Sequence, residues 1–200
     1  LIAVAVVAVL TAVILRGIRS SNRINTLIVS VTLAALLFFV LAGLPAATAK
    51  ASANLIPFFA PQTGAPPWQA VLHATALMFV AYTGYGRIAT LGEEVHEPRR
   101  TIPAAIITAL VVTMLLYVLV GFTAVASVGA EEYAALTHAT AAPLEAIARQ
   151  FSIPGAGLIL AVGAMTAMLG VLLNLILGLS RVLLAMGRRR DMPPVVAVID

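Results

Sequence analysis

The sequence contains no cysteine, which excludes disulfide bonds and thiolate metal sites. Charge is also scarce: 10% of the residues are charged, against about a quarter in a typical soluble domain. Hydrophobic residues make up 62% of the chain, and the mean hydropathy is +1.06. So few polar side chains cannot cover a soluble domain of this length, and a lipid bilayer is the expected solvent.

Two functional classes are excluded by what the chain lacks. Its net charge of +4 would suit a nucleic-acid binder if the basic residues shared one face, but they occur in short clusters between apolar blocks. No nucleic-acid partner is therefore expected. Within the apolar blocks we find no Ser/His/Asp or paired-aspartate arrangement, and no second histidine follows His96-Glu97 at metalloprotease spacing. The chain is predicted not to be an enzyme, with no metal site and no cofactor.

Four long stretches without charged residues are each long enough to cross the ~30 Å hydrocarbon core as a helix. Strand-like alternation, which a membrane barrel requires, is missing from them. A shorter apolar run over residues 1–15 is expected to be a helix cut by the boundary of a fragment of a longer protein. The predicted helices cover about 1–15, 24–45, 68–91, 103–128 and 155–186.

The basic residues indicate which connections are cytoplasmic. Ten of the twelve fall in alternate connections, and only Lys50 and Arg149 lie on the opposite side. By the positive-inside rule, the arginine-rich set faces the cytoplasm. That set comprises Arg16, Arg19, Arg23, Arg87, Arg99, Arg100, Arg181, Arg188, Arg189 and Arg190.

The two external connections are longer than the cytoplasmic ones. Residues 46–67 are rich in proline and glycine and are expected to be irregular. Residues 141–151 place Leu144, Ile147, Ala148 and Phe151 on one helical face, which predicts a short amphipathic helix. It could lie over the mouth of the bundle or be a surface helix without a gating role.

The segment from Trp68 to Leu91 contains Gly84 and Gly86 at membrane depth. Glycine weakens a helix by up to about 1 kcal/mol relative to alanine, so the helix is predicted to break near 83–86. An unwound turn exposes backbone groups that suit a zwitterionic substrate. The alternative is that these glycines only allow close helix packing.

The run from Met78 to Pro103 resembles the sixth helix and following loop of amino acid–polyamine–organocation transporters. In that family an aromatic-rich F-A-Y-x-G-F/Y segment leads into E-E-x-x-x-P-x-R-x-x-P. The I-A-T-x-G-E-E run resembles the cationic amino-acid transporter branch. The matching residues are Phe79, Ala81, Tyr82, Gly84, Tyr85, Ile88, Ala89, Thr90, Gly92, Glu93, Glu94, Pro98, Arg100 and Pro103.

A second match lies near the end of the chain, where residues 181–193 resemble the R-v-l-y-a-M-a-R-D-G-l-l-P run after the family's eighth helix. Arg189 and Arg190 replace the family's Asp-Gly. The resemblance implies an all-α integral membrane protein. The chain would be part of an inverted-repeat (5+5) bundle with one discontinuous helix, covering about the fourth to eighth transmembrane helices.

The resemblance implies that an amino acid binds at the broken sixth helix. Ala81 and Thr83 would contribute mainly backbone groups, and Tyr82 or Tyr85 an aromatic wall. The first helix, which supplies the other half of such a site, has no counterpart in this register. The implied substrate-binding residues are Phe79, Ala81, Tyr82, Thr83, Gly84, Tyr85 and Gly86.

Departures from the family pattern bear on the substrate and on coupling. Many members of the cationic branch carry an acid at the position of Gly86, and Arg87 follows here, which favours a neutral amino acid. Several proton-coupled relatives carry a lysine where Thr32 stands. His73 is then a candidate for protonation, unless it is a neutral histidine bonded between helices. The coupling ion could be H⁺ or Na⁺, and plain exchange also stays open.

Charged residues follow the broken helix on the cytoplasmic side. One hypothesis is an inner gate whose ion pairs open when the site faces inward; the alternative is a solvated turn with weak pairs. The residues concerned are Arg87, Glu93, Glu94, Arg99 and Arg100.

The sequence thus predicts secondary active transport of amino acids by alternating access, as symport or exchange. The competing hypothesis is a permease-like sensor or assembly partner that does not transport. A multi-pass protein of the plasma membrane is expected, in contact with lipid and an amino acid, and the sequence indicates no oligomeric state.

Overall fold

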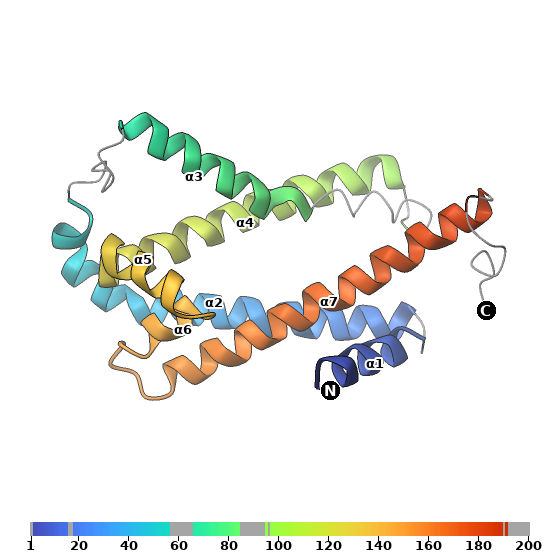
Figure 1. Ribbon diagram of the computed structural model, residues 1–200, viewed down its shortest axis with the longest axis horizontal. Helices are drawn as coiled ribbons and strands as arrows, with labels where there is room; N and C mark the ends of the chain where they lie inside the picture. Colours follow the sequence, from blue (N-terminus) through green and yellow to red (C-terminus); the bar gives the residue numbers. More distant parts are fainter. Residues whose placement is uncertain are drawn as a thin grey trace. The chain divides into compact units, whose positions relative to one another are not determined.

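The computed structural model describes residues 2–15, 18–56, 66–84, 95, 97–189 and 191, without the side chains of residues 2, 13, 15 and 18–21. All regular structure in these residues is helical, so the prediction of an all-α protein is confirmed. The helices can be followed in Figure 1. They are α1 (Ile2–Leu15), α2 (Ile18–Asn54), α3 (Pro67–Tyr82), α4 (Pro98–Val128), α5 (Ala130–Ala139), α6 (Pro143–Ala148) and α7 (Ala156–Arg188).

Three of the described helices are long and apolar enough to cross a membrane: Asn22–Asn54 within α2, α4, and α7. Large apolar side chains such as Val118 of α4 and Leu158 of α7 are exposed, at 63% and 71%. In water such large apolar surfaces would cause the protein to associate or aggregate, whereas the hydrocarbon core of a membrane solvates them. The chain is an integral membrane protein.

The helices divide into two compact units, and α2 contributes to both. The first unit comprises residues 1–38 and 155–200, and so contains α1, the first part of α2, and α7. Its core joins one buried side chain from each helix: Leu10 of α1, Ile28 of α2 and Leu173 of α7. Burial of apolar surface therefore links α7 to the two helices at the start of the chain.

Within this unit, α2 and α7 approach closely along a line of small and polar residues, which we call the α2–α7 seam. A Cβ at Gly163 would overlap that of Ala35, and one at Gly170 would lie 2.8 Å from Cγ2 of Ile28. Residue numbers increase along α2 from Ile28 to Ala35, while those of the α7 partners decrease from Gly170 to Gly163. The two helices are therefore antiparallel. Small residues let two backbones approach in a membrane, where dispersion and hydrogen bonds drive association.

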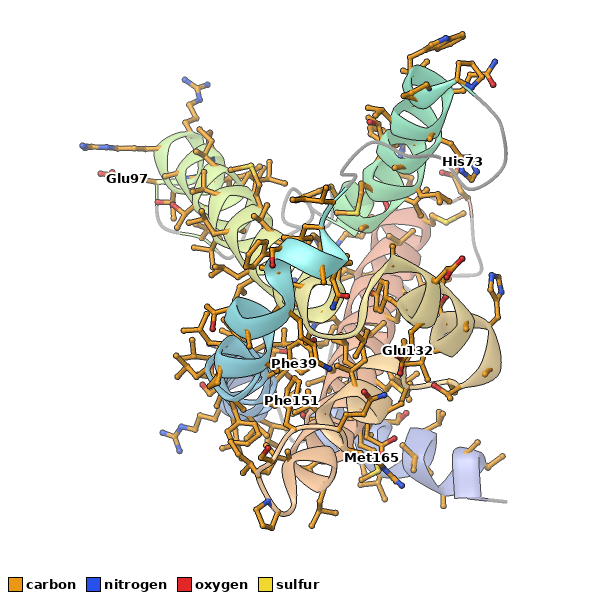
Figure 2. The ribbon with its side chains drawn as sticks, turned by 90° about the vertical axis from the view of Figure 1, so that its left-hand side faces the viewer. Phe39, His73, Glu97, Glu132, Phe151 and Met165 are labelled. Carbon is orange, nitrogen blue, oxygen red and sulfur yellow. The ribbon has the colours of Figure 1, made fainter. Side chains whose placement is uncertain are left out.

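The second unit comprises residues 39–154 and has its core at the ends of α2 and α4. The rings of Phe39 and Phe151, both labelled in Figure 2, pack against each other with their centroids 5.4 Å apart. Ile147 of α6 is fully buried in this unit. Gly43 leaves no room for a side chain, since a Cβ there would lie 2.5 Å from Cγ2 of Thr123 and 2.6 Å from Phe151.

A side chain from α2 forms a hydrogen bond with a backbone carbonyl at the C-terminal end of α4. The amide Nδ2 of Asn54 donates to the carbonyl of Ala126 over 2.9 Å. The backbone N–H of Gly129, whose φ of +90° suits glycine, donates to Val125 over 2.8 Å. Two of the four carbonyls that a helix end leaves free are thereby bonded.

Residues 46–54 were expected to be irregular, and this expectation is wrong, because α2 continues through Pro45 to Asn54. Proline removes one backbone donor from a helix. However, the following residues are rich in alanine, the strongest helix former. The hydroxyl of Thr48 also lies within hydrogen-bonding distance of the carbonyls of Leu44 and Pro45, at 2.9 and 3.1 Å.

The connections around α4 also differ from the expectations. The helix begins at Pro98 instead of near residue 103, so Pro103 lies inside it, and Arg99 and Arg100 belong to its first turn. Proline is favoured in a first turn, which explains the start at Pro98. Helix α5 was not predicted, and α6 occupies only residues 143–148 of the 141–151 stretch.

The α2–α7 seam can be tested by adding one methyl group. Gly163→Ala should lower the melting temperature of the purified full-length protein. Overpacking costs about 1–3 kcal/mol, more than the gain of up to about 1 kcal/mol that alanine brings to a helix. Gly178→Ala on the same helix is the matched control, because a Cβ there meets nothing within 4 Å. Adding Ala35→Gly should restore the Gly163→Ala variant; equal melting shifts for the two alanine variants would contradict close packing.

Candidate substrate site

Helix α3 carries the first three of the predicted substrate-binding residues: Phe79, Ala81 and Tyr82. Thr83 and Gly84 follow it in a 3₁₀ turn. Tyr85 and Gly86 lie outside the described residues. Proline at the first helical position, Pro67, fits the start of α3, because the missing N–H is not needed there.

The regular hydrogen-bond ladder of α3 ends at Tyr82. The backbone N–H of Thr83 donates to the carbonyl of Val80, three residues back, and the Thr83 hydroxyl donates to the same carbonyl over 2.8 Å. A 3₁₀ turn of this kind tightens the end of a helix. The turn coincides with the start of the predicted break; its remainder lies outside the described residues, so the discontinuity stays a prediction.

None of the α3 side chains is buried against the rest of the described chain. Phe79 is 70% exposed, and a Cβ at Gly84 would have no neighbour within 4 Å. No described residue therefore covers Phe79 or Gly84. An exposed apolar side chain of a membrane helix can face a ligand, lipid or another helix.

Tyr82 is half-buried because it packs against Tyr117 of α4. The ring centroids lie 5.5 Å apart and the ring planes are inclined by 64°, an edge-to-face arrangement. Sequence reasoning missed Tyr117. A signal existed, because Tyr117 is the one tyrosine in the sequence of α4, and its ring carries a polar hydroxyl in a span rich in apolar residues.

Thr32, a candidate for the coupling region, lies in the α2–α7 seam. Its hydroxyl lies 3.0 Å from the carbonyl of Ile28 and 3.1 Å from the hydroxyl of Thr166, which in turn lies 2.9 Å from the carbonyl of Gly163. Two hydroxyl protons are available for these three contacts, so at most two hydrogen bonds form at once. Thr166 was not singled out from the sequence.

The remaining predicted residues are dispersed. His73 projects from α3 and is exposed, as Figure 2 shows. Arg99 and Arg100 are exposed on the first turn of α4. Arg87, Glu93 and Glu94 lie outside the described residues, so the inner gate stays a prediction. Among the residues that were placed, no group of three His, Asp or Glu side chains could hold a metal ion.

Comparison with known proteins identifies the family. The family model described as "Amino acid permease" matches residues 1–200. The chain belongs to the amino acid permease family. This agrees with the resemblance to amino acid–polyamine–organocation transporters and with the prediction that the chain is not an enzyme.

Curated relatives of this chain are transporters. An uncharacterized transporter of Mycobacterium tuberculosis is 40% identical over 99% of the chain and 43% of its own length. A branched-chain amino acid permease of Lactococcus lactis is 28% identical over 96% of the chain and 41% of its own length. Cationic amino acid transporter 1 of Arabidopsis thaliana is 28% identical over the whole chain and 31% of its own length.

The permease chain spans less than half the length of each of these relatives. No solved structure matches it significantly.

The Thr32–Thr166 contact is testable by a double-mutant cycle. Thr32→Val and Thr166→Val should together destabilise the full-length protein by about 1 kcal/mol less than the sum of the single changes, because both remove one shared hydrogen bond. Denaturant unfolding in detergent measures the free energies. Thr26→Val is the control partner for Thr166→Val, since the Thr26 hydroxyl donates to the Asn22 carbonyl of its own helix. That pair should be additive; additivity of the Thr32 pair as well would refute the contact.

Proposed function

We propose that the full-length protein is a secondary transporter that carries amino acids across the plasma membrane by alternating access. The observation that carries the proposal is the end of the α-helical ladder at Tyr82, followed by the 3₁₀ turn at Thr83 and Gly84. This turn falls within the segment that resembles the family's substrate helix. Membership of the permease family supports the same conclusion.

The direction of α3 suggests which substrate group it would bind. By the positive-inside rule, α3 enters from the outside, so its C-terminal end lies within the membrane. The C-terminal end of a helix carries partial negative charge and free carbonyls. Carbonyls of its last turn, near Ala81 and Tyr82, would therefore accept hydrogen bonds from the substrate ammonium. The carboxylate would need N–H donors from other segments of the full-length protein.

A neutral amino acid is the proposed substrate class. Gly86 provides no acid to pair with a cationic side chain, and Arg87 would repel one. The relatives include a branched-chain amino acid permease and a cationic amino acid transporter, so both classes occur in the family. The exposed aromatic ring of Phe79, with Tyr82 beside it, suits an aliphatic side chain.

Coupling to an ion is proposed to involve the seam between α2 and α7. Thr32 places a hydroxyl where a lysine ammonium stands in several proton-coupled relatives, and Thr166 adds a second hydroxyl 3.1 Å away. Oxygen ligands suit Na⁺, whereas an aliphatic hydroxyl does not ionise near neutral pH. His73 is the alternative titrating group, which would favour H⁺.

Transport is tested by uptake of radiolabelled leucine into proteoliposomes that contain the full-length protein. Saturable uptake should be abolished by Gly84→Leu, because a bulky side chain in the substrate turn would block binding. Gly178→Leu on α7 is the control, since its surroundings are also open and it lies outside the proposed site. Leucine binding without flux would instead support the sensor hypothesis.

Substrate class and coupling are separated in the same vesicles. Unlabelled alanine and leucine should compete with uptake better than lysine and arginine; the reverse order would overturn the assignment to neutral substrates. An imposed Na⁺ gradient should accelerate uptake, and Thr166→Val should weaken this effect. Acceleration by a proton gradient that His73→Gln abolishes would assign coupling to His73.

A further inference from the structure

The ring contact between Tyr82 and Tyr117 connects the inner end of α3 to α4. No side chain of α3 is buried among the placed residues. The edge-to-face packing of the two tyrosine rings, with centroids 5.5 Å apart, is the aromatic contact that α3 makes with another placed helix. At 1.5 Å per residue, Tyr82 lies about 22 Å from the outer end of α3, and Tyr117 about 16 Å from that of α4. Both rings therefore lie within the ~30 Å hydrocarbon layer.

Among the described residues, the surroundings of the pair leave space for a ligand. Gly84 lies two residues after Tyr82, and a Cβ there would have no neighbour within 4 Å. The same holds for Gly121, which lies four residues after Tyr117 on α4. On the other side of Tyr117, the Thr113 hydroxyl is bonded to the carbonyl of Ala109 over 2.6 Å. Neither phenol hydroxyl of the pair is hydrogen-bonded to a residue that the structure places. Among the placed residues, the two rings are therefore held by their contact with each other and not by hydrogen bonds of their hydroxyls.

A tyrosine side chain has two rotatable torsions. Tyr82 is the last residue of α3 and is followed by the 3₁₀ turn at Thr83 and Gly84; the preceding turn of α3 restricts χ1 but leaves more than one orientation open to the ring. An aromatic neighbour in edge-to-face contact restricts both torsions and stabilises one orientation of the ring. In a binding site, a side chain that is already ordered loses less conformational entropy when the ligand arrives.

We infer that Tyr117 is a positioning residue for substrate binding: its ring holds Tyr82 in the orientation that packs against an aliphatic amino-acid side chain. This inference rests on the proposed function, because it takes Tyr82 to line the substrate site. Tyr117 itself acts through Tyr82. The effect depends on the ring of Tyr117 and not on its hydroxyl.

The test is leucine uptake by the full-length protein in proteoliposomes, with KM and kcat measured separately. Tyr117→Leu should raise KM about three- to tenfold and change kcat little, which is the size of effect expected for an aromatic pair. Tyr117→Phe keeps the ring and should keep KM. Tyr133→Leu on α5 is the control for loss of a tyrosine from the same unit and should leave KM unchanged.

A double-mutant cycle separates positioning from a general effect on folding. In a Tyr82→Leu background, Tyr117→Leu should change KM no further; the same fold-change in both backgrounds would overturn the inference. Leucine-dependent thermal stabilisation of the purified variants provides a second measure of binding and should follow the same pattern. Failure of the proposed function would be seen in the unmodified protein, as absence of both uptake and stabilisation, and the inference would fall with it.

Discussion

Backbone hydrogen bonding without water is the constraint on which this structure depends. In hydrocarbon, a free N–H or C=O costs several kcal/mol, so membrane segments are helical and interruptions need local compensation. Side chains supply that compensation at three places in the described helices. Thr48 lies against the carbonyls near Pro45, Asn54 bonds the end of α4, and Thr83 bonds the carbonyl of Val80 at the end of α3.

Close packing in the two units then uses residues without bulk. Gly163 admits Ala35 in the first unit, and Gly43 admits Thr123 and Phe151 in the second. Lipid tails are as apolar as the side chains, so apolar area alone does not hold membrane helices together. Dispersion contacts at short interatomic distances hold them together. These glycines therefore mark the packing interfaces here, as large apolar residues do in the core of a soluble protein.

The sequence predicted the helix bounds best where a long apolar run was bounded by charges, as in α7. It predicted poorly where local signals conflicted. Pro45 suggested an end to α2, but the alanine-rich stretch behind it continues the helix to Asn54. In the same way, Pro98 and Pro103 both fit a first turn, and the first of them begins α4.

For the candidate site, the family pattern in the sequence singled out the α3 residues as candidates but not their neighbours. Thr166 lies 134 residues from Thr32, and Tyr117 lies on a different helix from Tyr82. Such pairs depend on tertiary packing, which local pattern does not encode. The polar character of these residues in apolar spans was a visible signal, although it does not identify a partner.

The amide of Asn54 has a consequence for how the protein is made. Its acceptor, the carbonyl of Ala126, lies 72 residues later in the chain. During synthesis from the N-terminus, α2 therefore leaves the ribosome well before the end of α4 does. The last turn of α4 thus forms when its hydrogen-bond donor has already been synthesised, and a shortened α2 would leave the Ala126 carbonyl without that donor.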